Sequence, residues 1–119
     1  MPAPLHHKER VRKDLMREIG WTIANRLRDP RIPPIVTVLD VKLGDDTRNA
    51  TVCVSMYGED VEKDEAVAAL NHAAPAIQKM VSERVSVKHF PKLYFKLDKL
   101  LDQGQRINEL LNEIKDDLV

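Results

Sequence analysis

Apolar residues recur at every fourth position between Lys8 and Arg28, a spacing that places them on one face of a helix. The apolar positions are Val11, Leu15, Ile19, Ile23 and Leu27. At about 100° per residue, the opposite face carries Arg10, Lys13, Arg17, Trp21 and Arg28. The pattern predicts a helix that packs on a core with one face and presents cations on the other.

Two runs of alternating apolar residues follow, and they predict an antiparallel hairpin. In the first run, Ile35 to Leu43, one face is expected to carry Ile35, Thr37, Leu39, Val41 and Leu43. In the second run, the apolar face is expected to carry Ala50, Val52, Val54 and Met56. The intervening Gly44-Asp45-Asp46 has the composition of a turn. Because each strand has one apolar face, helices are expected to cover one side of the sheet.

The next segment has helical spacing that is broken by a proline. Residues 59–65 are mostly acidic, which suits the positive end of a helix dipole. Pro75 then interrupts the spacing, and proline both removes a backbone hydrogen bond and clashes with the preceding turn. We therefore expect two short helices with a kink at Ala73, Ala74 and Pro75.

A third alternating run, Leu93, Phe95 and Leu97, predicts a strand parallel to an earlier one, because a helical crossover connects them. The order is then helix, strand, strand, helix, kink, helix, strand and a last helix, which predicts an α+β fold. It resembles a KH module that lacks the Gly-x-x-Gly clamp loop. Residues 1–7 are expected to be flexible, residues 8–99 to form the domain, and residues 100–119 to form an amphipathic helix.

Asp29-Pro30-Arg31 lies where the basic helical pattern stops and the alternating pattern begins. Pro30 disfavours helical geometry at the residue before it and cannot donate to a helical ladder. Pro33 and Pro34 keep the following chain extended. The stretch predicts a stiff corner that holds the basic helix at a fixed angle to the sheet, with Arg31 as an exposed cation.

The net charge is zero, but the charges are segregated along the chain. Residues 8–31 hold eight Lys and Arg against four Asp and Glu, and residues 79–99 hold six against two. Two basic blocks favour contact with nucleic acid over an ordinary solvated surface, although ordinary solvation is the better explanation for any single cation of the second block. The candidate RNA-binding residues are Arg10, Lys13, Arg17, Arg28 and Arg31 in the first block, and Lys79, Arg84, Lys88 and Lys92 in the second.

Two alternatives stay open for Trp21, which lies on the cationic face of the first helix. Its ring has the shape to stack on an unpaired base. It also has a large apolar surface, and rings of this kind more often pack within the protein. In that case Trp21 would pack against the last helix.

The composition argues against several other classes of protein. Cys53 is the only cysteine, so no internal disulfide is possible and a reducing compartment is expected. No apolar run approaches the roughly 20 residues that span a bilayer, and the N-terminus lacks the apolar core of a signal peptide, so we expect a cytoplasmic protein. The glycines are too dispersed for a phosphate loop, and the histidines lack metal-ligand spacing. No enzyme activity, cofactor or metal is therefore expected.

The chain resembles the bacterial ribosome-binding factor A family from about Arg10 to Ile114. Asp-Pro-Arg alone is a weak motif, but the ordered set over this length is specific. The stretches that carry the resemblance are Leu27-Arg28-Asp29-Pro30-Arg31, Val36-Thr37-Val38, Ala50-Thr51-Val52-Cys53-Val54-Ser55, Leu70-Asn71-His72-Ala73-Ala74-Pro75, Phe90-Pro91-Lys92-Leu93-Tyr94-Phe95, Asp98 and Ile107-Asn108-Glu109-Leu110-Leu111.

The resemblance implies a KH-like fold of type II order and a non-enzymatic factor in ribosome biogenesis. Such a factor binds 16S rRNA in free, immature 30S subunits, near the neck and the 5′-end helix. It supports late maturation and 16S rRNA processing, matters most in the cold, and leaves with help from a GTPase. The resemblance also implies a monomer without a membrane partner.

The chain departs from this family at the kink. The family usually has Ala-x-Gly there, whereas this chain has Ala73-Ala74-Pro75. Glycine bends a helix by permitting positive φ, and proline bends it by fixing φ and removing a donor. A break is still expected, but its angle and the placement of Lys79 and Arg84 stay open.

An alternative function is that of a protein-interaction adaptor. In that case the acidic block Glu59–Glu65 and the last helix would dock a protein, and the basic faces would be incidental. Charge reversal in the basic or the acidic block distinguishes the two functions.

Overall fold

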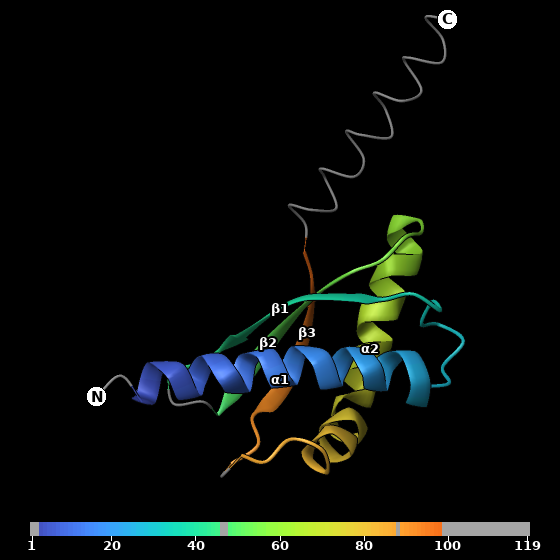
Figure 1. Cartoon of the computed structure of the whole chain (residues 1–119). Helices are drawn as coiled ribbons and strands as arrows, with labels where there is room; N and C mark the ends of the chain where they lie inside the picture. The colour runs from blue at the N-terminus through green and yellow to red at the C-terminus, as the bar shows by residue number, and fades with distance from the viewer. Residues whose placement is uncertain (1–2, 46–47, 88, 99–119) are drawn as a thin grey trace, which may run out of the picture.

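The computed structural model describes residues 3–45, 48–87 and 89–98, and these form two helices and a three-stranded sheet (Figure 1). The predicted last helix, residues 100–119, and Lys88 lie outside the described residues. The order of the elements confirms the predicted α+β class. The elements are α1 (Ala3–Arg26), β1 (Thr37–Leu43), β2 (Asn49–Ser55), α2 (Asp60–Ser82) and β3 (Lys92–Leu97).

Both helices pack on the same face of the sheet and share one core with it. Helix α1 contributes the apolar stripe that the sequence predicts, with Leu15, Ile19 and Ile23 buried. The sheet contributes Val41, Val52, Phe95 and their neighbours on the same face. Figure 1 shows that α1 and α2 run in clearly different directions over this core.

Helix α1 begins at Ala3 and ends at Arg26, so its bounds differ from the predicted Lys8 to Arg28. Two prolines near the N-terminus suggested a loose segment, but Pro4 lies in the first turn, where a proline is tolerated because the N–H it lacks has no helical partner. The corner that follows ends the helix early. Arg28 therefore lies in the loop after α1 and not on the helix.

Strand β1 contains a β-bulge that changes which of its residues face the core. Val38 pairs with Val54 and Asp40 pairs with Cys53, so Leu39 is the extra residue. A single extra residue reverses the side of every residue beyond it. The predicted common face of Ile35, Thr37, Leu39, Val41 and Leu43 is therefore wrong. Ile35 precedes the strand and is 72% exposed, and the core instead receives Val36, Val38, Val41 and Leu43.

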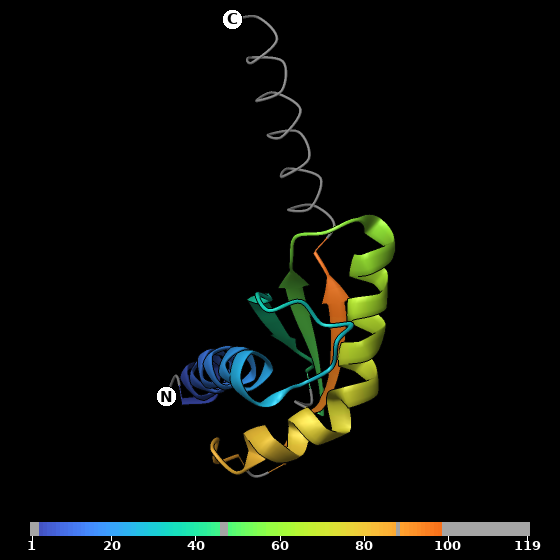
Figure 2. The same ribbon diagram turned by 90° about the vertical axis from the view of Figure 1, so that its right-hand side faces the viewer.

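Helix α2 is one helix with Pro75 inside it, so the predicted division into two short helices is wrong. Figure 2 shows that its ribbon nevertheless changes direction along its length. Leu70 before the proline and Ile77 after it are both fully buried in the same core. Burial of apolar side chains stabilises the helix on both sides of the proline. The loss of one backbone hydrogen bond at Pro75 therefore bends the helix without ending it.

The sheet has the order β1-β2-β3, with β1 antiparallel and β3 parallel to the central strand. The parallel pairing of the third strand is confirmed. The apolar face predicted for the second strand is also confirmed, since Ala50, Val52, Val54 and Met56 are buried.

Strand β3 is an edge strand of the sheet, and a side chain from α2 bonds backbone groups on its outer edge. The amide nitrogen of Asn71 on α2 donates to the carbonyl oxygen of Phe95 at 3.0 Å. The backbone N–H of Phe95 donates to Asn71 Oδ1 at 2.7 Å. Asn71 therefore replaces the backbone of a further strand and ties α2 to the sheet edge.

We expect Asn71→Ala to lower the free energy of unfolding by about 1–3 kcal/mol, because it leaves both backbone groups of Phe95 without a partner. Urea denaturation measures the change. Asn25→Ala is the matched control, since Asn25 is exposed on α1 and its side chain donates to the carbonyl oxygen of Trp21 in the same helix. The control is expected to change stability by no more than about 0.5 kcal/mol. Equal stability of Asn71→Ala and the wild type would contradict the assigned role.

Candidate nucleic-acid interface

The outward face of α1 carries three of the cations that the sequence predicts. Arg10, Lys13 and Arg17 are all exposed, because Leu15 and Ile19 on the opposite face are fully buried and fix the rotation of the helix. Neither Arg10 nor Lys13 forms an ion pair or hydrogen bond with any residue that the structure describes. These two cations are therefore available to an anionic partner.

Arg17 is exposed but partly engaged. Its guanidinium lies 3.2 Å from the carboxylate of Asp14 and 3.5 Å from that of Glu18. The Arg17 side chain is 68% exposed, so water and salt screen its interaction with both carboxylates. Arg17 can therefore exchange these partners for a phosphate at low cost.

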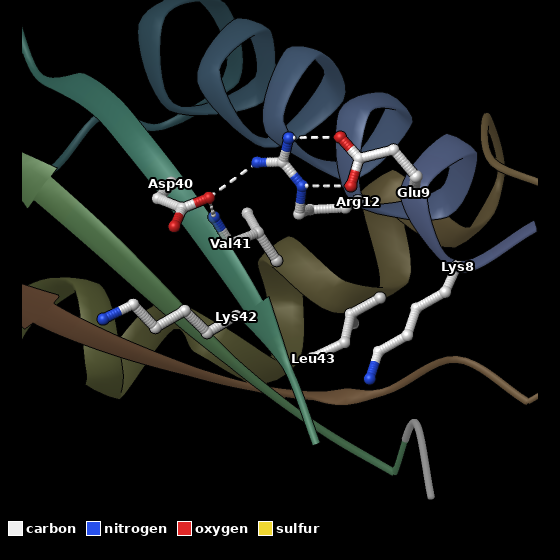
Figure 3. Close-up of a pocket in the computed structure, with 7 residues that line it drawn as sticks. All are labelled: Lys8, Glu9, Arg12, Asp40, Val41, Lys42 and Leu43. Atoms are coloured by element: carbon white, nitrogen blue, oxygen red, sulfur yellow. Dashed lines mark hydrogen bonds and ion pairs between the residues drawn. The ribbon is translucent and has the colours of Figure 1, made fainter. Parts of the chain in front are cut away.

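Arg12 links α1 to β1, a role that the sequence did not reveal (Figure 3). Its guanidinium donates to Asp40 Oδ1 at 2.6 Å and to Glu9 Oε2 at 3.0 Å. The hydrogen bonds to Glu9 and then to Asp40 raise the pKa of Arg12, so it stays charged. This arginine is committed to holding the helix on the sheet and is not a free cation of the interface.

Glu18 and Arg84 form a second link, between α1 and the chain after α2. Arg84 Nε donates to Glu18 Oε2 at 2.6 Å, and Glu18 is only 9% exposed. This hydrogen bond lowers the pKa of Glu18, so the carboxylate stays ionised beside the arginine. The charge pattern assigned Arg84 to RNA binding and did not reveal its partner.

Trp21 lies under the same arginine. The guanidinium carbon of Arg84 is 4.7 Å from the centroid of the indole ring, within the range of a cation–π contact. One alternative for Trp21, packing against the last helix, falls on residues outside the described ranges. Trp21 is 43% exposed and follows Arg17 by about one turn of α1.

The predicted corner at Asp29-Pro30-Arg31 is built around one carboxylate. The backbone N–H of Ile32 donates to the carbonyl oxygen of Asp29 at 3.0 Å, which closes a turn. The backbone and side chain of Arg31 donate to Asp29 at 2.9 Å and 2.7 Å. The side-chain bond from Arg31, with its backbone bond, lowers the pKa of Asp29 to about 2. The charge of Arg31 is thus compensated within the corner.

Among the described residues, the structure does not bring the predicted cations of the second block together on one surface. Arg84 is paired with Glu18, while Lys79 is exposed in the last turn of α2 and Lys92 is exposed at the first residue of β3. Lys88 lies outside the described residues. What the fold brings together is Arg84 with Trp21 and Glu18 of the first block.

The described part of the chain offers little for other kinds of site. No group of three or more His, Cys, Asp or Glu side chains that could hold a metal ion occurs there. Within the same ranges, neither helix combines the length and apolar character needed to cross a membrane.

Comparison with known proteins identifies the family. A family model for ribosome-binding factor A matches residues 7–111. The chain belongs to the ribosome-binding factor A family. Ribosome-binding factor A from Halothermothrix orenii is 40% identical over 103 residues, which are 87% of this chain and 84% of that protein. Ribosome-binding factor A from Clostridium botulinum is 34% identical over 114 residues, 95% and 98% of the two chains.

Solved structures of ribosome-binding factor A have the same fold. The crystal structure of the factor from Thermus thermophilus is similar with a TM-score of 0.67 and 28% identity, covering 76% of this chain and 93% of that one. A homology model of the Thermus thermophilus factor, fitted into a cryo-EM map of its complex with the 30S subunit, is similar with a TM-score of 0.60 and 27% identity, covering 71% and 88%.

The hydrogen bonds to Asp29 predict how the free energy of unfolding depends on pH in the acidic range. Because the pKa of Asp29 falls from its ordinary 3.8 to about 2 on folding, its contribution to stability is complete above pH 3.8 and is lost as the pH falls to about 2. The difference in unfolding free energy between the wild type and Asp29→Asn should therefore shrink across this window. Urea denaturation at a series of pH values measures it.

Arg31→Gln provides the control for the same corner. It removes the side-chain bonds to Asp29 but keeps the backbone N–H bond, so the acid dependence should become smaller without vanishing. A difference between wild type and Asp29→Asn that stays constant from pH 5 to about pH 2 would contradict the assignment.

Proposed function

We propose that this protein binds immature 30S ribosomal subunits through 16S rRNA and supports the late maturation of the small subunit. The observation that carries the proposal is the family match over residues 7–111. The related Thermus factor, which has been fitted into a map of a 30S complex, supports the choice of subunit. The cationic outer face of α1 supplies a surface with the right charge for RNA.

The proposed mechanism is electrostatic docking on folded RNA. Base edges in an RNA helix lie in a deep, narrow groove, so a protein reads its shape and its phosphates. Arg10 and Lys13 form no ion pair among the described residues, and Arg17 has only weak ones. Arg12 holds α1 to β1, and Glu18 holds it to the chain after α2. The helix that carries these side chains is therefore already fixed in position and does not have to be ordered on binding.

The finer expectations from the resemblance belong to the same proposal. They include binding near the neck and the 5′-end helix of 16S rRNA, a role in rRNA processing and in the cold, release with help from a GTPase, and action as a cytoplasmic monomer without enzymatic activity. The α–β–β–α–β order, with a parallel third strand, supports the KH-like assignment of type II.

The adaptor function remains a second candidate because of one feature of the structure. Tyr57 and Val61 are 73% and 68% exposed beside the acidic first turns of α2. Apolar side chains next to carboxylates suit a basic protein better than they suit RNA. If only changes in Glu59–Glu65 weaken subunit association, the adaptor function is correct.

We expect Arg10→Glu and Lys13→Glu each to weaken binding to purified 30S subunits. With four to six phosphate contacts, the log–log slope of affinity against salt is expected to be about −3 to −5 for the wild type, and each variant should make it less steep by about 1. Binding is measured across roughly 50–300 mM salt.

Arg26→Glu is the matched control for these charge reversals. Arg26 is exposed on the same helix but lies nine residues after Arg17, which at about 100° per residue places it on the other side of α1. Its reversal should leave the salt slope unchanged. A flat salt response of the wild type, or equal losses in all three variants, would contradict docking through the outer face of α1.

A further inference from the structure

The face of the sheet opposite the core forms a second surface, which the proposed function does not use. Lys42, Thr51 and Tyr94 lie side by side across the three strands, and Cys53 and Lys96 are neighbours in the next row. These positions alternate with the buried core residues of each strand, so they face away from α1 and α2. Lys42, Tyr94 and Lys96 are all exposed.

This outer face is hollowed over its central strand. A cavity of about 370 Å³ is lined by Lys42, Thr51, Cys53, Lys96, Leu97 and Asp98. Its floor consists of the short side chains of β2, and its two sides consist of lysines from β1 and β3. Lys42 and Lys96 are two strands and one row apart. At about 4.8 Å per strand and about 6.8 Å per row of two residues, their backbones lie roughly 12 Å apart. Their long side chains can therefore both reach an anion above the floor.

The charges around this hollow leave it cationic. Neither Lys42 nor Lys96 forms an ion pair with a carboxylate in the described part of the chain. Asp40, the neighbour of Cys53 on β1, is held by Arg12, and Lys42 extends away from Glu9 (Figure 3). Asp98 lies at the rim and has an interaction of its own. Two ammonium groups over a floor of small side chains suit a phosphate group.

An exposed aromatic ring adjoins the two lysines. Tyr94 is 61% exposed, and it follows Lys42 and Thr51 in the same row across the sheet. Lys96 is two residues from Tyr94 on the same strand, and Lys42 is in the same row. A ring on an open sheet face with lysines at such positions can stack an unpaired base while the lysines hold the adjoining phosphates. We propose that the outer face of the sheet binds a single-stranded RNA segment, with a phosphate between Lys42 and Lys96 and a base on Tyr94.

The composition of the face argues against the chain's own C-terminal segment as its occupant. That segment has apolar residues at helical spacing, Ile107, Leu110, Leu111, Ile114 and Leu118. A helix with such a stripe needs an apolar partner surface to bury it. The outer face offers threonine, cysteine and lysine with a single ring, and so suits a polyanion better.

The test measures binding of the full chain to a fluorescent oligouridine of about ten nucleotides, and to an RNA duplex of the same length. Tyr94→Leu keeps an apolar side chain but removes the ring, and should weaken oligouridine binding roughly tenfold. Tyr94→Phe should retain binding. Lys42→Gln and Lys96→Gln should each make the salt slope less steep by about 0.7, the value for single strands. Duplex binding should change little in all four variants.

Two controls make the outcome specific to this face. Tyr57→Leu removes an even more exposed ring that lies beyond the end of β2 and outside the hollow, and it should leave oligouridine binding unchanged. Lys13→Glu should weaken 30S binding but keep the dependence of oligouridine binding on Tyr94. This separation distinguishes failure of the sheet proposal from failure of the proposed function.

Two results would overturn the proposal. In the first, Tyr94→Leu and Tyr57→Leu bind oligouridine as the wild type does, and only Lys13→Glu weakens it, so that α1 alone binds RNA. In the second, the wild type shows no oligouridine binding that depends on Tyr94, and such binding appears only after Leu110 and Leu111 are replaced by aspartate. The C-terminal segment of the chain would then be the occupant of this face.

Discussion

The burial of one stripe of α1 is the constraint on which the rest of this structure depends. Leu15 and Ile19 have no exposed surface, so α1 cannot rotate without exposing them to water. Two ion pairs flank the stripe, from Arg12 to Asp40 on β1 and from Glu18 to the chain after α2. Together they fix which side chains of the helix point outward, and so decide which cations can meet RNA.

The same constraint separates the cations that are paired within the fold from those that are free to bind a partner, although they look equivalent in the sequence. Residues 8–31 contain eight lysines and arginines. Arg12 and Arg31 are paired with carboxylates within the fold, and only Arg10, Lys13 and the weakly paired Arg17 form a row on the outer face of α1. A count of basic residues therefore overstates the binding surface, and the cations without strong partners are a better measure of it.

Periodicity predicted those parts of the fold in which one face of an element is buried. The stripe of α1, the apolar face of β2 and the presence of the third strand follow from it. The helical crossover before the third strand predicted its parallel pairing. The bulge at Leu39 did not, because one extra residue leaves an alternating pattern looking intact while it reverses the sides beyond it. The division of α2 at Pro75 was also wrong, since burial on both sides of the proline keeps the helix continuous.

The two ion pairs that hold α1 in place could not be predicted from the sequence for a different reason. Arg12 and Asp40 are 28 residues apart, and Glu18 and Arg84 are 66 apart, so nothing in the local pattern joins them.

The most direct measurement of the central claim is sedimentation of a cell lysate through a sucrose gradient, with detection of this protein in each fraction. If the rigid cationic face of α1 docks the protein on immature small subunits, the wild type should migrate with free 30S subunits and be absent from polysomes. The Lys13→Glu variant should shift toward the top of the gradient. A wild-type protein found mainly in polysomes, or unchanged migration of the variant, would contradict the account.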